Sequence, residues 1–379
     1  MNKYMKSKNN DIQLFKFLYC WIIVLYHLEY DTSGVACPGG SFGVEYFLLS
    51  SGIFLFMGFE RQQNAGKLQT PGQYLWKRFS RFFPWSLTGY LLAAVVNYGC
   101  ISPIRSPGKL MDAFSSDIWE ILMIKWNGMN ENMLCLNTPA WTLSSLCIVG
   151  FAIWGFMYYY QERFLKLFMP ISLIMGYGFW RHLDSASTQV WIGFTAFGTF
   201  RTWLVICLSY YVVRMAQYLK NIRLKPLGIW LLTAAEVTLQ MWSLWMIFNR
   251  DTRFAQWLTT LLMMLALTIA LSGQSMLVRW LNKSRIVDYL GKLSMSVFLV
   301  HVPVLQYYQW KVDIRNASAV ELIPLFAAIA AVFGVPLSYY KLADSDHSES
   351  PCRFALCLCG TGNRIRRAAV KADKAVNDH

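Results

Sequence analysis

Long apolar stretches with almost no charged residues are the feature that most constrains how this chain folds. Of its 379 residues, 55% are hydrophobic and only 15% are charged, whereas roughly a quarter of the residues in a soluble domain are charged. The charges lie in short clusters between apolar runs of about 15 to 24 residues, and a helix needs about 20 apolar residues to cross about 30 Å of hydrocarbon. The runs are too numerous for the core of one soluble domain. We therefore expect an all-α, polytopic integral membrane protein.

The apolar runs predict about ten transmembrane helices. The first run follows a basic stretch, as in a signal peptide, but no small-residue cleavage site closes it, so it is expected to remain as the first helix. The expected spans are residues 12–30, 42–59, 82–100, 140–160, 167–180, 200–218, 227–248, 254–273, 293–310 and 319–340. Residues 185–199 are a candidate for part of a broken or re-entrant span. Residues 1–340 would then form one transmembrane domain, and residues 341–379 a basic tail without a folded domain.

Lys and Arg are distributed unevenly between the two sides of this predicted bundle. With the N-terminus inside, the cytoplasmic segments hold 25 Lys and Arg and the outer segments hold 9, while Lys16 lies within the first span. Cytoplasmic loops of membrane proteins collect basic residues, so both termini are expected in the cytoplasm and the protein in the plasma or inner membrane. The same bias accounts for the net charge of +14. No basic patch with interleaved aromatics stands outside the spans, so no nucleic-acid partner is expected.

The nine cysteines do not form a metal framework. The three in the tail lack CxxC spacing and a metal-binding histidine pattern, so no metal cofactor is expected. Three others would lie near or beyond the outer surface, where a disulfide can form: Cys37, Cys100 and Cys135.

The longest outer loop, residues 101–138, contains the amphipathic segment DIWEILMIKW. This segment is expected to lie along the membrane surface, with Trp119 and Trp126 at the interface.

Two ionisable residues lie inside the first span. Such residues are costly in a membrane and are candidates for function. Eleven residues separate Lys16 from His27, which places both within about 20° of one helix face and about 16 Å apart along the axis. Lys16 would lie near the cytoplasmic end and His27 near the outer end. The plain alternative is a snorkelling lysine and an interfacial histidine.

Glu45 opens the second span at a depth similar to that of His27. A carboxylate there would orient an imidazole and stabilise its charged form, as in acid–base pairs. The alternative is a surface glutamate that the dipole at a helix N-terminus favours.

A cluster of cations precedes Pro84 in the segment YLWKRFSRFFPWS. Arg78 and Arg81 share a helix face at spacing i, i+3, and a pair of guanidinium groups suits phosphate binding because each offers bidentate donors. The alternative is an ordinary basic cytoplasmic loop.

Five segments together resemble the membrane-bound acyltransferase-3 family. They occur in the order typical of that family, over residues 11–305: LFKFLYCWIIVLYHLEY, SFGVEYFLLSSGIFL, KRFSRFFPWSL, PAWTLSS and YLGKLSMSVFLVHVPVL. These bacterial enzymes move acetyl or other acyl groups onto cell-surface glycans and related acceptors.

The resemblance assigns roles to residues of this chain. His27 matches the family's essential histidine, and Arg78 and Arg81 match its arginine motif. Trp141 and Ser144 match its tryptophan–serine motif, which implies contact with the acceptor.

Some positions depart from the family pattern. Lys16 stands where arginine is usual, and Glu45 replaces an aspartate. Leu146 occupies the place of a glutamate, which bears on acceptor specificity. His301 matches a position that is often histidine, but it lies in mid-span and is expected to be structural.

The resemblance implies an enzyme that takes acyl-coenzyme A, with acetyl the expected group, as its donor. Arg78 and Arg81 would hold the phosphates at the cytoplasmic face, with Lys16 assisting. The pantetheine arm would thread between helices to His27, which would act as general base on an acceptor hydroxyl with Glu45 as its orienting partner. A covalent acyl-histidine is the second possibility. The expected partners are membrane lipid and a glycan, whose selection would involve the 101–138 loop.

Two other classes of protein remain open. A transporter or flippase for a lipid-linked sugar would also be polytopic, basic inside and rich in aromatics, but it would not consume a thioester. A regulatory or structural membrane protein that has lost catalysis is the third class.

Overall fold

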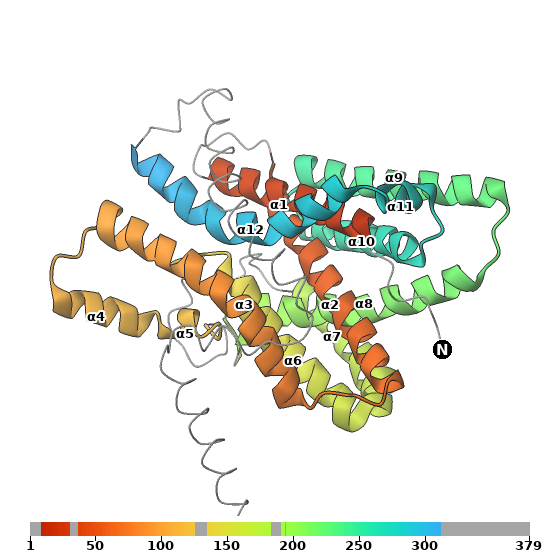
Figure 1. Cartoon of the computed structure of the whole chain (residues 1–379), viewed down its shortest axis with the longest axis horizontal. Helices are drawn as coiled ribbons and strands as arrows, with labels where there is room; N and C mark the ends of the chain where they lie inside the picture. The colour runs from red at the N-terminus through yellow and green to blue at the C-terminus, as the bar shows by residue number, and fades with distance from the viewer. Residues whose placement is uncertain (1–8, 31–36, 126–134, 183–190, 194, 312–379) are drawn as a thin grey trace, which may run out of the picture. The chain divides into compact units, whose positions relative to one another are not determined.

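The computed structural model describes residues 9–30, 37–125, 135–182, 191–193 and 195–311 (Figure 1). Within these ranges the chain is helical apart from one short antiparallel strand pair, so the prediction of an all-α fold is confirmed. The long helices are α1 (Asn10–Tyr30), α2 (Gly43–Asn64), α3 (Pro71–Ala94), α6 (Ala140–Arg163), α7 (Met169–Arg181), α8 (Phe197–Asn221), α9 (Pro226–Asn249), α10 (Arg253–Ser272) and α12 (Arg285–Lys311). The shorter elements are η1 (Gly40–Phe42), the π-helical η2 (Val95–Ile101), α4 (Pro107–Ser116), α5 (Ile118–Ile121), the π-helical η3 (Phe164–Phe168), β1 (Trp191–Ile192), β2 (Thr195–Ala196) and α11 (Met276–Leu281). The predicted span 319–340 and the tail 341–379 lie outside the described residues.

Six helical segments of the described chain are long and apolar enough to cross a membrane, in keeping with a multi-pass protein. They are Asn10–Leu28, Gly40–Asn64, Ala140–Arg181, Pro226–Asn249, Arg253–Ser272 and Arg285–Lys311. Helices α3 and α8, with 24 and 25 residues, are as long as most of these six segments, but they carry more polar residues. Those polar residues include the arginines that the candidate site uses.

The helix that carries Arg78 and Arg81 begins earlier than predicted, at Pro71 rather than at residue 82. Thr70 caps it: its side chain accepts a hydrogen bond from the Gln73 amide, and the Gln73 side chain accepts one from the Thr70 amide. This reciprocal pair satisfies two helix-end donors, and Pro71 suits the first helical turn. Both arginines therefore lie within the helix.

The fourth and fifth predicted spans form one helical segment with a sharp reversal. The backbone leaves helical geometry at Tyr160, where φ is −139° and ψ is 37°. The rings of Phe156 and Phe168 stack with centroids 5.5 Å apart, although twelve residues of straight helix span about 18 Å. The chain therefore reverses direction between α6 and α7, as two separate spans require, and α7 packs against α8.

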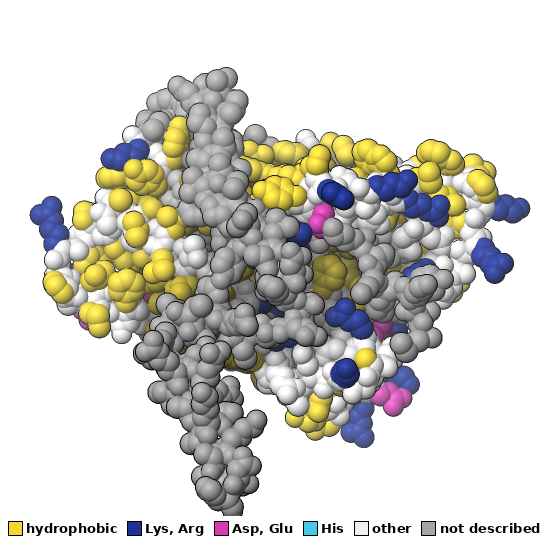
Figure 2. Space-filling view, viewed as in Figure 1, with side chains coloured by type: hydrophobic (Ala, Val, Ile, Leu, Met, Phe, Trp, Pro, Cys, Tyr) yellow, Lys and Arg dark blue, Asp and Glu magenta, His cyan; other side chains and the backbone are white. Residues whose placement is uncertain are grey.

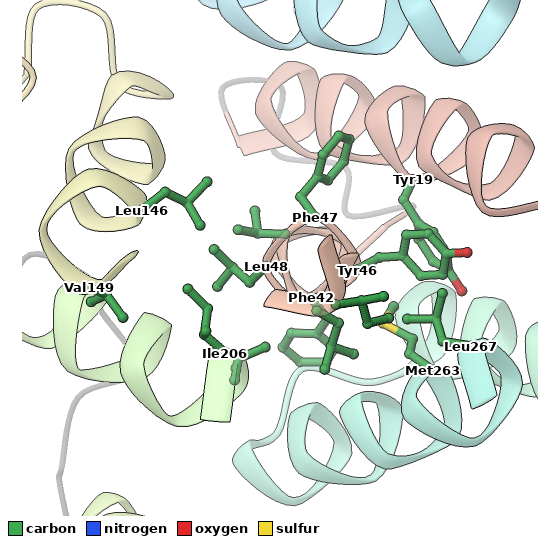
Figure 3. Close-up of a cluster of buried hydrophobic side chains, with 14 of the residues drawn as sticks. Tyr19, Phe42, Tyr46, Phe47, Leu48, Leu146, Val149, Ile206, Met263 and Leu267 are labelled. Atoms are coloured by element: carbon green, nitrogen blue, oxygen red, sulfur yellow. The ribbon is translucent and has the colours of Figure 1, made fainter. Parts of the chain in front are cut away.

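Helix α2 lies at the centre of the packing. In its apolar window 78% of the residues are buried, against 28% for α9. Figure 3 shows Tyr46, Phe47 and Leu48 of α2 surrounded by side chains from α1, α6, α8 and α10. The contact with α8 is close, because a Cβ added at Gly52 would lie 3.1 Å from the Ile206 Cα and overlap the Ser209 side chain. The packing of α2 against α8 therefore requires glycine at position 52.

Large apolar side chains cover the outward face of α9. Figure 2 shows hydrophobic side chains along the upper edge, where α9 lies in Figure 1. The exposed ones on α9 are Leu227, Trp230, Leu231, Val237, Met241, Trp242, Trp245 and Phe248. A contiguous apolar face of this kind is avoided in water, and lipid is its natural solvent.

Within the 101–138 loop, α4 is largely exposed, whereas part of the segment that follows it packs into the protein. In the segment predicted to be interfacial, Glu120, Met123 and Lys125 are each at most 2% exposed. Trp119 is half-buried, and Trp126 lies outside the described residues. All three charged residues of this segment, Asp117, Glu120 and Lys125, are buried, so its polar side faces the protein and not the solvent. Its contact with the membrane surface, through the exposed Ile118 and Leu122, stays a prediction.

A buried pair of carboxyl groups joins the start of α1 to α9. Asp11 and Glu236 are both fully buried, and their carboxyl groups interact with each other. None of the four carboxyl oxygens receives a hydrogen bond from a donor in the described part of the chain. Two facing carboxyls satisfy each other only by sharing a proton. Neither residue was predicted as important.

This pairing yields a prediction for stability. In Asp11→Asn the amide still donates to Glu236, so the free energy of unfolding should change little. In Asp11→Ala the Glu236 carboxyl loses its partner, which should cost roughly 1–3 kcal/mol. Thermal unfolding in detergent micelles measures both. Equal losses in the two variants would contradict the shared hydrogen bond.

Candidate active site

Two histidines from opposite ends of the chain meet within the bundle. His27 lies near the end of α1 and His301 lies in α12, and these two helices pack along each other. Their ring centroids are 5.2 Å apart with an angle of 44° between the ring planes. His27 is half-buried, whereas His301 is fully buried. The structure therefore brings together the predicted base and a histidine that was predicted to be structural.

The protonation pattern of His301 follows from its hydrogen bonds. Its Nδ1 lies 2.8 Å from the Phe298 carbonyl oxygen and 3.3 Å from that of Val297. Carbonyls only accept, so Nδ1 carries the hydrogen, and Nε2 of the neutral ring is an acceptor. Nε2 is buried without a hydrogen-bond partner among the described residues.

A proline two residues after His301 ties this turn of α12 to the outer loop. Pro303 has no N–H, so it cannot donate to the Leu299 carbonyl four residues earlier. The Asn137 side-chain amide donates to that carbonyl at 2.9 Å instead. Gly89 of α3 makes room, because a Cβ there would lie 2.6 Å from Asn137 Nδ2 and 2.9 Å from the Leu299 oxygen.

Asn137 is held in turn by a buried carboxylate of the loop. Glu120 accepts hydrogen bonds from the backbone amides of Leu136 at 2.7 Å and Asn137 at 2.9 Å. Burial raises the pKa of Glu120 to about 7, although the two amide bonds lower it. Asp117 raises the pKa further and Lys125 lowers it.

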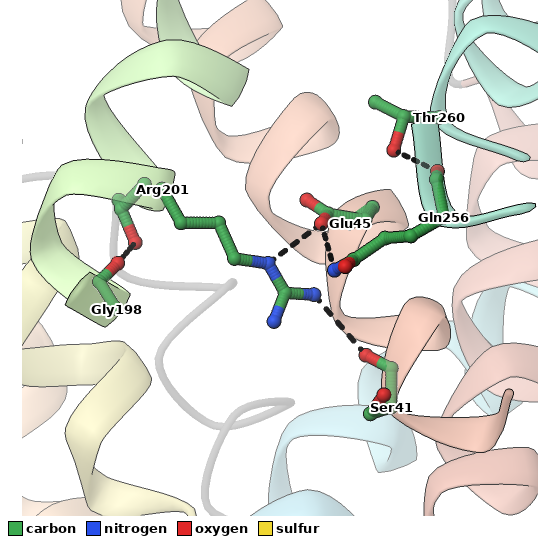
Figure 4. Close-up of polar contacts among 7 residues, drawn as sticks. Ser41, Glu45, Gly198, Arg201, Gln256 and Thr260 are labelled. Carbon is green, nitrogen blue, oxygen red and sulfur yellow. Dashed lines mark hydrogen bonds and ion pairs between the residues drawn. The ribbon is translucent and has the colours of Figure 1, made fainter. Parts of the chain in front are cut away.

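Glu45 is bonded to residues other than the imidazole it was expected to orient. Its Oε1 accepts from Arg201 Nε at 2.6 Å and from Gln256 Nε2 at 3.0 Å, and Arg201 Nη2 donates to the Ser41 carbonyl at 3.3 Å (Figure 4). Glu45 and Arg201 are both buried. The other oxygen, Oε2, has no hydrogen-bond partner in the described part of the chain. The structure thus shows Glu45 joining α2, α8 and α10.

Arg201 and Gln256 were not among the predicted site residues. Arg201 lies inside α8 and is 2% exposed. The sequence could have indicated this pair, because an arginine inside an apolar run requires a partner. Glu45 is an acidic residue at the start of another span and could have been matched to it.

A row of aromatic rings links Lys16 to the histidine pair. The Lys16 Nζ lies 5.9 Å from the centroid of the Phe47 ring. Phe47 stacks with Phe298 at 5.4 Å, and Phe298 lies 6.0 Å from the His301 ring. The shared face predicted for Lys16 and His27 is thus lined by Phe47 and Phe298.

One nitrogen of the Arg78 guanidinium is hydrogen-bonded, and another has no acceptor among the described residues. Its Nη1 donates to the Tyr74 hydroxyl at 2.7 Å, and its guanidinium lies 5.4 Å from the Phe82 ring centroid. Tyr74 in turn stacks flat on Trp154 at 4.2 Å. The Nε of Arg78 is buried without an acceptor among the described residues, whereas Arg81 is exposed. This geometry leaves donors available for an anion.

The residues of the tryptophan–serine motif lie inside the protein. Trp141 and Ser144, in the first turns of α6, are 7% and 1% exposed. The next residue, Ser145, shares a hydrogen bond of 3.1 Å with Thr199 of α8. The predicted contact of Trp141 and Ser144 with an acceptor remains a prediction.

No group of three or more His, Cys, Asp or Glu in the described ranges is arranged to hold a metal ion. None of the six described cysteines is in a disulfide, so the one that the sequence permitted among Cys37, Cys100 and Cys135 is not formed.

Comparison with known proteins identifies one family. A family profile described as an acyltransferase domain, acyltransferase 3, matches residues 9–342, which is most of the chain. Neither the curated proteins nor the solved structures contain a significant match to the chain.

The buried pair of Glu45 and Arg201 yields a prediction. Arg201→Met leaves the Glu45 charge uncompensated and should lower the free energy of unfolding by roughly 3–5 kcal/mol. The double variant Glu45→Leu/Arg201→Met removes both charges and should recover much of that loss. Thermal unfolding in detergent measures the cycle. Additive losses would show that the pair does not couple the helices.

Glu120 gives a prediction for pH dependence. Its pKa is about 7 in the folded protein and lies near 4.3 in an unfolded chain. The folded state therefore binds this proton more tightly, so its stabilising contribution is complete below pH 4.3 and is lost as pH rises through 7. The midpoint of thermal unfolding should fall between pH 5 and pH 8, and Glu120→Gln should reduce that fall.

Asp112 provides the matched control for this measurement, because it lies exposed on the neighbouring α4. Asp112→Asn should leave the pH dependence unchanged. An identical pH profile in Glu120→Gln and the wild type would refute the assignment.

Proposed function

The chain belongs to the acyltransferase-3 family and is a multi-pass membrane acyltransferase, and on that premise we propose its donor, acceptor and catalytic residues. The proposed reaction moves an acyl group, with acetyl expected, from cytoplasmic acyl-coenzyme A to a hydroxyl of a cell-surface or extracellular glycan. The observation that carries the proposal is the half-buried imidazole of His27 beside a second imidazole.

The proposed donor site is the α3 face that carries Arg78 and Arg81. Coenzyme A is polyanionic, and charge-assisted bonds from guanidinium to phosphate are strong. The unsatisfied Nε of Arg78 supplies a buried donor, and the exposed Arg81 adds a second positive charge on the same helix. Lys16 would assist at the start of the arm, where its ammonium lies over Phe47.

The proposed path of the pantetheine arm follows α1 from Lys16 to His27. The distance along the helix is about 16 Å, and Phe47 and Phe298 provide an apolar wall for this uncharged chain. Phe47 and Phe298 stack on each other. Their rings must therefore move apart for the pantetheine arm to pass.

In the proposed reaction, His27 accepts the proton of the acceptor hydroxyl while that oxygen attacks the thioester carbonyl. The carbon–sulfur bond then breaks, and the imidazolium returns its proton to the departing thiolate. The products are an ester and free coenzyme A, and the imidazole is neutral again. An acyl-histidine intermediate is the alternative route.

Glu45 was expected to act directly on His27, and its bonds support a positioning role instead. The pair with Arg201 fixes the N-terminal end of α2, which also carries Phe47. We propose that the buried residues Trp141 and Ser144 contribute to the binding site of the acceptor. We place the protein in the plasma or inner membrane with both termini in the cytoplasm.

The catalytic assignment is tested by following free thiol release from acetyl-coenzyme A with purified protein in lipid nanodiscs. His27→Ala should lower the rate by about 100-fold or more, as the loss of a general base does. His182→Ala changes an exposed histidine and should have no effect. Undiminished turnover in folded His27→Ala would exclude His27 as the base. A transporter would release no thiol in any of the proteins.

The donor site is tested by calorimetric titration with acetyl-coenzyme A. Arg78→Ala/Arg81→Ala should weaken binding by roughly 10-fold or more, because charged hydrogen bonds contribute about 1.5–3 kcal/mol each. Arg223→Ala removes an exposed arginine after α8 and serves as the control. Equal affinity in both variants would remove the phosphate assignment.

A further inference from the structure

The bare Nε2 of His301 is a buried polar atom that the proposed reaction does not use. A core histidine with a purely structural role is expected to have both nitrogens bonded. Here the described residues satisfy only Nδ1. An acceptor left unpaired in a protein interior costs about 1–3 kcal/mol, so the position is one that a ligand would satisfy.

The direction of Nε2 follows from the bonding of Nδ1. Nδ1 is held against the Phe298 and Val297 carbonyls of its own helix. Nε2 lies on the far side of the imidazole ring and therefore projects away from the α12 backbone. The rings in contact with His301 are those of His27 and Phe298, so this acceptor belongs to the same site as His27.

The helix turn around His301 is held from several sides. Asn137 donates to the Leu299 carbonyl, which Pro303 leaves free, and Glu120 holds the Asn137 backbone. The imidazole therefore stands on a braced turn, which fits a group that must present one atom in a fixed place.

We propose that His301 Nε2 accepts a hydrogen bond from a second hydroxyl of the acceptor, adjacent to the one that is acylated, so that the acceptor is a vicinal diol such as a sugar ring carries. The inference rests on the proposed function and narrows its acceptor. His27 receives the proton of the reacting hydroxyl and returns it to the thiolate. His301 neither gains nor loses a proton, because the neighbouring hydroxyl keeps its own.

The chain offers two informative variants at this position. In His301→Asn the side-chain amide still donates to the α12 carbonyls, as Nδ1 does, but the outward acceptor is removed. In His301→Gln the longer side chain places a carbonyl oxygen near the position of Nε2. His301→Asn therefore removes the hydrogen-bond acceptor while it keeps the bond to the α12 carbonyls. His301→Gln restores a hydrogen-bond acceptor without an imidazole ring.

The test compares trans-1,2-cyclohexanediol with cyclohexanol as acceptors of the acetyl group, measuring kcat/KM by ester formation. The wild type should prefer the diol by about 10-fold or more after correction for its two hydroxyls, because one added hydrogen bond and its otherwise unpaired acceptor are worth about this much. His301→Asn should reduce the preference to about 1 while keeping the cyclohexanol rate, and His301→Gln should restore part of it. A preference that survives in His301→Asn, or an equal loss for both acceptors, would overturn the proposal.

A second measurement without acyl-coenzyme A separates this inference from the proposed function. Binding of the two alcohols to the wild type and His301→Asn is followed by saturation-transfer NMR. If the wild type consumes no thioester with any acceptor, the acyl-transfer assignment fails, and this comparison still decides the role of His301. Tighter binding of the diol that His301→Asn abolishes supports the hydrogen bond, and equal binding of both alcohols overturns it.

Discussion

The packing of α1 along α12 is the contact on which the site depends. It joins helices that are about 270 residues apart in the chain, and it brings the His27 ring to 5.2 Å from that of His301. Neither helix could place two imidazoles together alone, because a helix presents only its own residues at spacings of three and four. The Asn10 side chain, which donates to the Leu281 and Ser284 carbonyls, holds the start of the same pair.

Buried polar groups then determine how the other helices sit around this pair. Glu45, Arg201 and Gln256 connect α2, α8 and α10, and Asp11 and Glu236 connect α1 and α9. In a membrane, apolar packing alone distinguishes one helix partner from another only weakly, since lipid tails are as apolar as leucine. A charge or carboxyl that must find its partner gives each helix a specific neighbour and rotation.

Local chemistry near the histidines shows how such a site is held in place. Pro303 removes a backbone donor from α12, Asn137 supplies the replacement, and Gly89 leaves the space for it. The three residues come from a helix, a loop and another helix. The 101–138 loop thereby takes part in holding this turn of α12, although its sequence suggested a segment lying on the membrane surface. Burial of Glu120 and Lys125 is what distinguishes the two arrangements.

The sequence by itself determined the all-α membrane class, the helix count in outline, and the residues His27, Lys16, Arg78 and Arg81 as those of interest. These follow from apolar run length, charge placement and helical spacing, which are local properties. Only the tertiary structure decided that Glu45 pairs with Arg201, that His301 faces His27, and that Arg78 keeps an unsatisfied donor. The reason is physical: the partner of a buried polar group depends on which helix faces it and at what rotation, and apolar periodicity specifies neither.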